Sequence, residues 1–358
     1  MTLDDLRHYA VTRSLFTPTT LQRALDKLGF VQADPIRAPA RAQDLTLRHR
    51  VTGYRAGDLE RRYAELDVHE DFFVNYGFVT GAVQALMHPR GGATPWTSGR
   101  GRHVRTLLDF VRTRGSVHPR EVDAHFAHGS VTNYWGGSSS ATTHLLDAMH
   151  YRGLLRIARR EGGIRIYAAH EHQAVPRSAT DRRARLDALV DVIVCKYAPL
   201  PAASLAVLVR RLRYAVPQWT GELTAALQRA KRRLPHADVE GVDWYWPEEP
   251  VFTVAGNDDV VRLLAPFDPV VWDRRRFELL WGWAYRFEAY TPAAKRQLGY
   301  YALPLLWRDH VIGWGNVSVK DGTLHSDVGY IASQPRSRVF RRALEEELDR
   351  LRIFLGVK

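Results

Sequence analysis

The stretch GFVQADPIR, residues 29–37, places an amide and a carboxylate two positions apart, at Gln32 and Asp34. Alternate residues of an extended chain point to the same side, so these two side chains would lie next to each other. A carboxylate can accept a proton from a water molecule, and an amide can hold that water through a hydrogen bond. A structural interpretation is also open, because Asp before Pro often begins a turn and Gln32 could cap a backbone amide.

Other catalytic chemistries lack the residues that they need. The dipeptide His69-Glu70 has no second histidine to complete HExxH, and the sequence contains no CxxC, no GxSxG and no Walker loop. His118, His125 and His128 have no nearby thiolate or carboxylate cluster to complete a tetrahedral metal site. We therefore expect no metal and no cofactor.

The residues before the Gln32 and Asp34 pair predict the element that must position it. In TPTTLQRALDKL, which precedes the quoted stretch, the apolar residues recur at helical spacing. A helix therefore leads to the point where a buried strand would begin, and the two polar side chains follow it.

The charge balance favours a polyanionic partner. With 51 Lys and Arg against 39 Asp and Glu, the chain has a net charge of +12 and a pI of about 9.9. Arginine dominates the cations, and its planar guanidinium suits phosphate and guanine edges. A genome rich in arginine codons would give the same excess, so charge by itself leaves both explanations open.

Residues 98–175 carry the order of a winged helix. VRTLLDFVRTR, PREVDAHFA and NYWGGSSSATTHLLDAMHYRG predict three helices, and LLRIARREGGIRIYAA predicts a β-hairpin. Such a module usually lays its third helix in a DNA groove. The run GGSSS at residues 136–140, which includes Ser138 and Ser139, could offer backbone N–H groups to phosphate or could be a capping loop.

The same order can be traced in residues 1–97, which include the Gln32 and Asp34 pair, and in residues 176–250. Residues 251–358 change to the aromatic and β-branched segments FELLWGWAYRFEAYT, YYALPLLWRDHVIGWGNVSV and TLHSDVGYI, and then to the amphipathic SRVFRRALEEELDRLRIFLG. The predicted fold class is α+β: three tandem winged-helix domains followed by a carboxy-terminal antiparallel β-barrel with a terminal helix.

Three stretches resemble one known family. QADPIRAPARAQDL, the WGG-S-S-T run with its hairpin, and APFDPVVWDRRRFELLWGWAYRFEAYTPAAKRQLGYYALPLL are similar to the AlkZ/YcaQ (AlkX) family of bacterial DNA glycosylases, over nearly the whole chain. The resemblance implies that the three winged helices and the barrel form a C-shaped cradle for duplex DNA. It also implies hydrolysis of the N-glycosidic bond of N7-alkylated guanine, including the unhooking of interstrand crosslinks.

The resemblance also implies which residues are catalytic. The family motif is Gln-x-Gln in its AlkZ branch and Gln-x-Asp in its YcaQ branch, and Gln32-Ala33-Asp34 matches the second. Alkylation at N7 makes guanine a good leaving group, so we expect Asp34 to accept the proton of the attacking water and Gln32 to hold that water. No lysine is adjacent in the sequence, which predicts a monofunctional enzyme without a Schiff-base step.

Several further residues are predicted to bind DNA. They are Arg37, Arg41, His69, Ser138, Ser139, Arg156, Arg159, Arg160, Arg165 and Arg274. Structural roles stay open for some of them: Arg37 or Arg41 could pair with Asp34 or Asp44, and Asp268, Asp273 and Arg274 could form ion pairs at the start of the barrel.

The expected partner is double-stranded DNA that carries alkylated or crosslinked guanine, bound by a monomer with no membrane contact. No window approaches 18 uncharged apolar residues, and the amino terminus lacks the apolar run of a signal peptide, so we expect a cytoplasmic protein that associates with the nucleoid through DNA. The alternative function is a winged-helix DNA-binding protein or transcriptional regulator without catalysis, which would share the charge and the helix-hairpin order.

Overall fold

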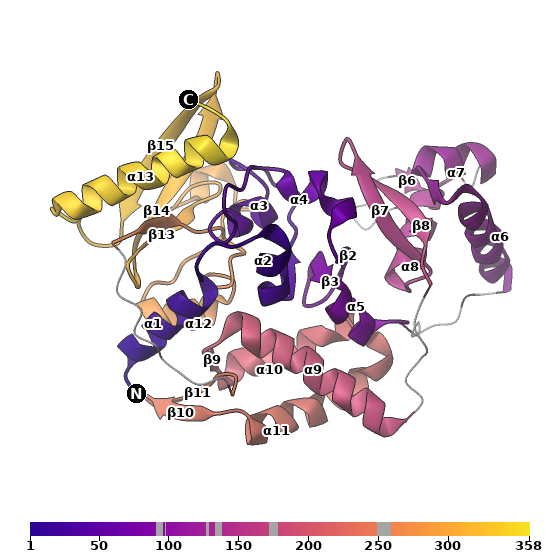
Figure 1. Cartoon of the computed structure of the whole chain (residues 1–358), viewed down its shortest axis with the longest axis horizontal. Coiled ribbons are helices and arrows are strands. Elements are labelled where there is room, and N and C mark those ends of the chain that lie inside the picture. Colours follow the sequence, from indigo (N-terminus) through magenta and orange to yellow (C-terminus); the bar gives the residue numbers. More distant parts are fainter. Residues whose placement is uncertain (91–95, 97, 127–128, 133–137, 172–177, 249–258) are drawn as a thin grey trace. The chain divides into compact units, whose positions relative to one another are not determined.

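The computed structural model describes residues 1–90, 96, 98–126, 129–132, 138–171, 178–248 and 259–358, drawn as ribbons in Figure 1. The chain forms two compact units, each built from separate segments. Unit 1 contains Met1–Leu59, Val190–Val209 and Leu227–Lys358, and unit 2 contains Glu60–Leu189 and Arg210–Ala226. The domain boundaries expected from the sequence stay a prediction.

Unit 1 begins with short helices around one strand. These elements are α1 (Leu3–Ser14), α2 (Leu21–Leu28), β1 (Phe30–Gln32), α3 (Ala42–Leu47) and α4 (Asp58–Arg61), where the chain passes to unit 2. A capping box, in which Thr2 and Asp5 exchange side-chain and backbone hydrogen bonds, starts α1. The apolar residues of α2 are all buried, which confirms the helix predicted before the Gln32 and Asp34 pair.

The middle of the chain supplies three helices and a hairpin. In order they are α9 (Ala179–Tyr197), β9 (Leu200–Pro201), α10 (Ala202–Arg211), α11 (Leu223–Arg233), β10 (His236–Val239) and β11 (Val242–Tyr245). Strand β11 pairs antiparallel with both β10 and β9. The tight β10–β11 turn uses positive φ angles at Glu240 and Gly241. The helix and hairpin order predicted for residues 176–250 is therefore present.

Unit 1 ends in a four-stranded antiparallel sheet that curls into a half-barrel (Figure 1). Its strands, in spatial order, are β12 (Val261–Leu263), β13 (Leu303–Trp307), β14 (His310–Lys320) and β15 (Thr323–Tyr330). At Gly313, a Cβ would lie 2.1 Å from the carbonyl oxygen of Gly329, so the β14–β15 contact requires glycine there. The terminal helix predicted from the sequence is α13 (Arg338–Leu355), whose buried side includes Phe340 and Leu351.

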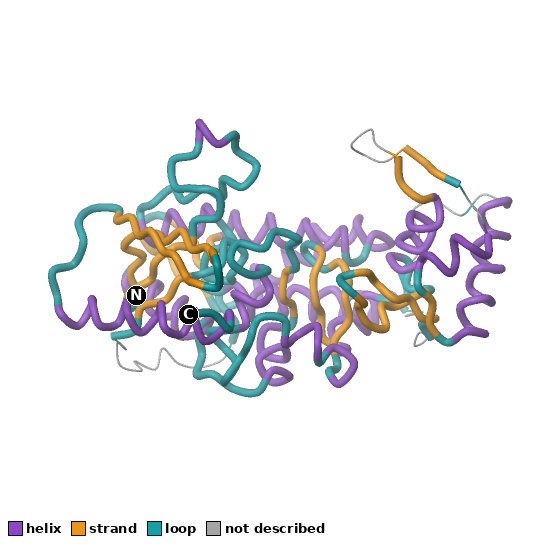
Figure 2. Tube along the Cα trace, turned by 90° about the horizontal axis from the view of Figure 1, so that it is seen from above, coloured by secondary structure: helices purple, strands orange, loops and turns teal. Residues whose placement is uncertain are grey.

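The segment FELLWGWAYRFEAYT is not a strand, and its prediction as part of the sheet was wrong. Its first five residues, Phe277 to Trp281, belong to helix α12 (Arg274–Trp281). The side chain of Asp273 caps the amino terminus of α12, and Gly282 ends the helix in the left-handed conformation. The following chain up to β13 is mostly loop, with the short helix η4 (Ala293–Lys295) in it, and Figure 2 draws such loops in teal. Local capping therefore outweighs the β propensity of the aromatic residues.

Unit 2 contains the helix and hairpin order predicted for residues 98–175. The elements are α6 (Ser98–Arg114), β4 (Ser116–Val117), α7 (Pro119–Phe126), α8 (Ala141–Tyr151), β7 (Leu155–Glu161) and β8 (Ile164–Ala169). The sheet order is β4-β8-β7, and Leu107, Val111 and Leu146 form part of its core. A second strand pair, β5 (Ser130–Thr132) and β6 (Ser138–Ser140), was not predicted. That the chain contains three winged helices stays a prediction.

The rest of unit 2 is a hairpin with short helices. It comprises η1 (Tyr63–Glu65), β2 (Val68–Phe72), β3 (Tyr76–Thr80), α5 (Gly81–Met87), η2 (Leu212–Tyr214) and η3 (Pro217–Glu222). Strands β2 and β3 pair antiparallel from Val68–Thr80 to Phe72–Tyr76. The segment GDLERRYAEL contains α4 and η1, and the segment VTGAVQALM contains α5.

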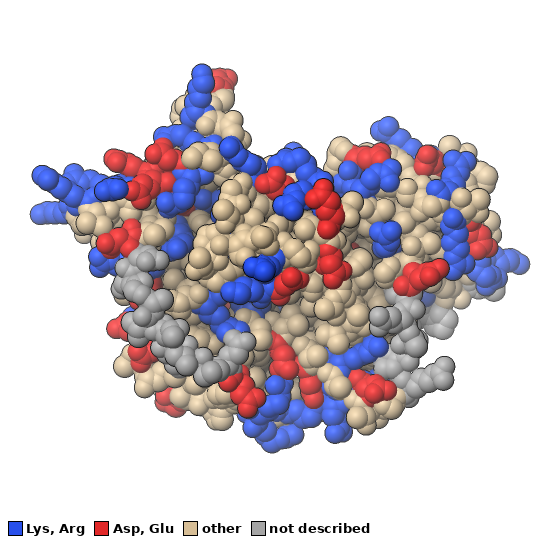
Figure 3. Space-filling model, viewed as in Figure 1, with Lys and Arg blue, Asp and Glu red and all other residues tan. Residues whose placement is uncertain are grey.

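Charged side chains of both signs are dispersed over one face of the molecule (Figure 3). On the face drawn in Figure 3, Lys and Arg alternate with Asp and Glu and do not gather in one uninterrupted patch. On this face, the positive side chains therefore do not form a single continuous surface, although the whole chain has a net charge of +12. Within the part of the chain that the structure describes, no helix combines the length and the apolar character needed to cross a membrane.

Candidate active site

Gln32 is positioned by a helix, a turn and a strand. Thr20 caps the start of α2, and Gly29 ends the helix with a φ angle of 63° while its N–H group donates to the carbonyl of Leu25. The chain then becomes extended in β1, where Phe30 and Val31 are buried. Gln32 ends this strand with only 5% of its surface exposed. A buried amide requires hydrogen-bond partners, because water cannot satisfy it fully.

The partner of Gln32 comes from the other end of unit 1. Trp272 Nε1 donates a hydrogen bond of 2.6 Å to Gln32 Oε1 across 240 residues of sequence. Gln32 therefore does not cap the backbone beside it, as the structural interpretation of the motif allowed. Within the described residues, the amide nitrogen of Gln32 has no acceptor in the protein. The nitrogen is thus the end of the side chain that can serve another partner.

Asp34 follows the strand and is half-buried. Its Oδ1 accepts a hydrogen bond of 2.9 Å from the N–H group of Ile36, so the turn expected from an Asp-Pro sequence does form. Among the described residues, Asp34 forms no ion pair, and the pairing with Arg37 or Arg41 that the sequence left open is not observed there. Burial raises the pKa of the Asp34 carboxyl, against the opposing effect of the Ile36 hydrogen bond.

Two tyrosines lie near Asp34. Burial, followed by the negative charge of Asp34, raises the pKa values of Tyr290 and Tyr301, so both phenol groups lie within electrostatic reach of this carboxylate. Tyr290 is 79% exposed, whereas Tyr301 is buried. Phe287 contacts both rings, with centroid distances of 6.1 and 5.2 Å. Because the pKa values of Tyr290 and Tyr301 are raised, both hydroxyl groups are neutral at ordinary pH and add no charge near Asp34.

A buried ion pair holds the segment that carries Trp272. Arg50 donates to both carboxylate oxygens of Asp268, at 2.7 and 3.0 Å, and both side chains are fully buried. Asp268 also accepts the N–H group of Val270, and its carbonyl accepts the backbone N–H of Trp272. The interpretation of Asp268 as an ion-paired residue is confirmed. The Arg50–Asp268 ion pair fixes a turn whose last residue, Trp272, donates the hydrogen bond to Gln32.

Lys196 lies beneath β1. Its Nζ donates to the carbonyl of Phe30 and lies 5.0 and 5.3 Å from the ring centroids of Phe30 and Tyr197. Burial, with a smaller contribution from the charge of Arg50, lowers the pKa of Lys196 to about 7. The sequence placed no lysine next to the motif, but the fold brings this one within two residues of Gln32 along the strand. Its amine is buried and bonded to the backbone.

The remaining predicted residues of unit 1 differ in their surroundings. Arg37 is exposed, and Arg41 is half-buried at the start of α3. Arg274 donates to the carbonyls of Val271 and Pro266, and its guanidinium lies 4.5 Å from the ring centroid of Tyr285. Asp273, which could have been its ion-pair partner, caps α12 instead. DNA contacts by these three arginines stay predictions.

In unit 2, the predicted arginines on the β7–β8 hairpin pair with acids. Arg160 makes two hydrogen bonds of 2.6 Å to the carboxylate of Glu70, and Arg165 pairs with Asp147 at 2.9 Å. Arg159 pairs with its exposed neighbour Glu161 at 2.7 Å. The Arg160 pair links the hairpin to β2, whereas the exposed Arg159–Glu161 pair contributes little to stability. Contacts of these arginines with DNA stay predictions.

The other candidates in unit 2 are less constrained. Arg156 is half-buried on β7. His69 lies on β2 with its ring 5.8 Å from that of His170, and burial lowers its pKa. Ser138 and Ser139 form the first part of strand β6. Gly136, Gly137 and the possible metal ligand His128 lie outside the described residues.

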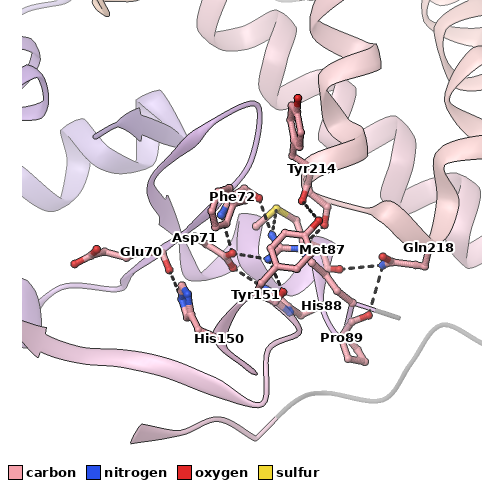
Figure 4. A network of polar contacts seen from close by, with 12 residues as sticks. Glu70, Asp71, Phe72, Met87, His88, Pro89, His150, Tyr151, Tyr214 and Gln218 are labelled. Atoms are coloured by element: carbon pink, nitrogen blue, oxygen red, sulfur yellow. Dashed lines mark hydrogen bonds and ion pairs between the residues drawn. The ribbon is translucent and has the colours of Figure 1, made fainter. Parts of the chain in front are cut away.

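A network around Asp71 anchors the β2–β3 hairpin of unit 2 (Figure 4). Asp71 accepts from His88 and Arg90, each at 2.6 Å. Arg90 also donates to the carbonyls of Phe72, Tyr151 and Ala215. Burial opposes the ionisation of Asp71, but the charges of Arg90 and His88 outweigh it and hold the pKa of this carboxyl far below its usual range. Every partner is a fixed part of the fold, so this carboxylate is structural.

Sequence reasoning proposed Gln32 and Asp34 as catalytic residues, and this assignment stays a prediction; it did not consider Trp272 or Lys196, which the fold places beside Gln32 and β1. Trp272 belongs to the conspicuous run APFDPVVWDRRR, in which only the charged residues were considered. Lys196 belongs to the apolar run VDVIVCKYA. A lysine is rarely buried without a partner, so its position in such a run could have drawn attention to it.

Comparison with known proteins gives two results. A family model described as "DNA glycosylase AlkZ-like" matches residues 25–354, nearly the whole chain. The solved structure of the Streptomyces sahachiroi DNA glycosylase AlkZ is similar, with a TM-score of 0.64 and 16% sequence identity over 100% of this chain and 97% of that chain. At this identity, the structural likeness concerns the fold.

Proposed function

The chain belongs to the AlkZ-like family of DNA glycosylases, and from this premise we propose that it hydrolyses the N-glycosidic bond of cationic N7-alkylguanine in duplex DNA. The observation that carries the proposal is the environment of Asp34. A half-buried carboxylate that forms no ion pair among the described residues lies two positions from the buried amide of Gln32. A carboxylate in this state is available to a substrate.

The substrate class follows from charge. A guanine alkylated at N7 carries a positive charge, so its departure neutralises the ring and needs little help from a general acid. The sugar becomes positively charged in the transition state, and the carboxylate of Asp34 stabilises that charge. Water forms the new bond to the sugar carbon, the bond from this carbon to the base nitrogen breaks with its electrons passing to the base, and Asp34 takes the proton of the water.

The proposal includes a single chemical activity. A lyase step would need an amine that reaches the sugar carbon to form a Schiff base. Lys196 is the amine that the fold brings near β1, but it is buried and donates to the carbonyl of Phe30. We therefore propose a monofunctional glycosylase. Borohydride should trap no covalent complex with DNA, and a trapped complex lost in Lys196→Met would contradict this part.

The primary test measures base release. Duplex DNA with one N7-methylguanine should release that base in the presence of the enzyme and chelator, and an N7-linked interstrand crosslink should be converted into separable strands. A protein that binds both duplexes but releases nothing would refute the proposed substrate. Release from the monoadduct without any effect on the crosslink would restrict the activity to single-strand lesions.

A further inference from the structure

The side-chain amide of Gln32 can occupy its site in two orientations that exchange its oxygen and its NH₂ group. Only one of them presents a donor to a water molecule. We propose that Trp272 is a positioning residue that fixes this amide, so that the NH₂ group of Gln32 faces the attacking water. The inference rests on the proposed hydrolytic function and assigns to it a residue outside the Gln-x-Asp motif.

The orientation follows from the chemistry of the indole group. An indole nitrogen carries a hydrogen and donates only, so the Gln32 atom that lies 2.6 Å from Trp272 Nε1 must be the carbonyl oxygen. Gln32 is 5% exposed, so bulk water competes weakly for this bond. Turning the amide over would set two donors against each other and leave both unsatisfied in a buried place.

Trp272 is itself held from several sides. Its backbone N–H donates to the carbonyl of Asp268 at 2.8 Å, and the Asp268 carboxylate is held by Arg50. The ring of Tyr197 lies against the indole, with a centroid distance of 5.4 Å. Tyr197 and Lys196 are consecutive at the end of α9, so one helix end supports both the indole and the backbone of β1. A donor on a rigid support can fix a flexible amide.

The fixed amide complements Asp34. When the Gln32 NH₂ group donates to one lone pair of the water, and Asp34 accepts one of its protons, the other lone pair is free to attack the sugar carbon. A reversed amide would present its carbonyl oxygen to the water. This oxygen accepts a hydrogen bond but is too weakly basic to remove a proton. The water would then be held by two acceptors, and its reacting lone pair would not be directed.

The first test is Trp272→Phe, which retains a ring and removes the donor. We expect the single-turnover rate of N7-methylguanine release to fall about threefold to tenfold, as for the loss of one neutral hydrogen bond, with unchanged affinity for the DNA. Trp281→Phe is the matched control, because Trp281 Nε1 also donates a hydrogen bond of 2.8 Å, to the carbonyl of Asp309. The control should release base at the wild-type rate.

A double-mutant cycle separates positioning from packing. In a Gln32→Ala background, Trp272→Phe should cause no further loss of rate, because the amide that it positions is absent. An equal loss in both backgrounds would show a packing role and overturn the inference, as would a Trp272→Phe enzyme as fast as the wild type. A wild type that never releases the base would instead refute the proposed function, and the inference with it.

Gln32→Glu tests the same idea without changing Trp272. The new side chain still offers Trp272 an oxygen, but its other end is a second oxygen in place of the NH₂ group. Release should fall as far as in Gln32→Ala, while thermal stability stays close to that of the wild type. If Gln32→Glu released base at the wild-type rate, the donor role of Gln32 would be excluded even where Trp272→Phe fails to fold.

Discussion

In unit 2, the buried carboxylates of Glu70 and Asp71 each face a guanidinium, whereas in unit 1 the half-buried carboxylate of Asp34 forms no ion pair among the described residues. The pKa values move accordingly. Burial opposes the ionisation of all three carboxyl groups. Arg160 nevertheless lowers the pKa of Glu70, and Arg90 and His88 lower the pKa of Asp71. Asp34 has no such partner in the described part of the chain, and burial raises its pKa. A buried carboxylate that is paired with a guanidinium stabilises the fold. A carboxylate without such a partner is a candidate for chemistry.

The largest expected effect is on catalysis at Asp34. Asp34→Asn removes the proposed proton acceptor and the charge proposed to stabilise the sugar, so base release should fall by about 10²–10⁴-fold with DNA affinity and melting temperature retained. Single-turnover assays and fluorescence anisotropy measure the two quantities. Asp26→Asn, at an exposed aspartate of α2, is the control and should behave as the wild type. If Asp34→Asn were fully active, Asp34 would not be the base, and its lack of an ion pair among the described residues would not distinguish a catalytic carboxylate from the structural ones of unit 2.

The converse experiment addresses unit 2. Asp71→Asn leaves the buried guanidinium of Arg90 without its charge partner, so the free energy of unfolding should fall by about 3–5 kcal/mol. Urea denaturation checks this value. Asp109→Asn is the control, because its pair with Arg112 is exposed, and it should change stability by less than about 0.5 kcal/mol. A fully stable Asp71→Asn would show that the network around Asp71 does not anchor unit 2.

The pH dependence of base release sharpens the comparison. The proposed role of Asp34 requires its ionised form, and burial raises its pKa above the ordinary 3.8, so the rate should start to fall at a higher pH than for a free aspartate. Below this pKa the fall should be about tenfold per pH unit. Circular dichroism should stay constant over the same range, because the lowered pKa values keep Glu70 and Asp71 ionised. A rate that does not change down to pH 4 would exclude Asp34 as the base.

The smallest effect concerns the buried cation of unit 1. Lys196 loses its proton near pH 7 in the folded chain and near 10.5 when unfolded, so the unfolded chain binds more protons between these values. The free energy of unfolding should therefore rise with pH above about 7, by roughly 1 kcal/mol per pH unit. This added stability is lost again as the pH falls towards 7. Urea titrations should show that Lys196→Met abolishes this slope, whereas a control at the exposed Lys295, Lys295→Met, retains it. An identical slope in Lys196→Met would contradict the assignment.

Local patterns in the sequence predicted local structure well. The helix before Gln32, the β7–β8 hairpin and the terminal helix each depend on side-chain periodicity and turn residues within one short segment. The prediction for FELLWGWAYRFEAYT was wrong because its aromatic residues suggested a strand. The Asp273 cap and Gly282 instead bound a helix, which is followed by a loop.

The candidate site was predictable only in part. Gln32 and Asp34 follow from their spacing and the family resemblance, but their environment depends on contacts between distant segments. Nothing in the residues around position 32 indicates that a tryptophan 240 positions away donates to the amide. The position of Lys196 beneath β1 likewise depends on how α9 packs, which periodicity does not specify.

The bond between Trp272 and Gln32 also bears on the order in which the protein is made. A ribosome that has synthesised the first 250 residues has produced the Gln-x-Asp motif, the helix that carries Lys196 and all of unit 2. It has not yet produced the indole that orients the amide. Nascent chains and fragments truncated before Asp268 thus contain the motif without the indole that we propose to position its amide, and the proposed arrangement of Gln32 can form only when the last third of the chain has joined the first.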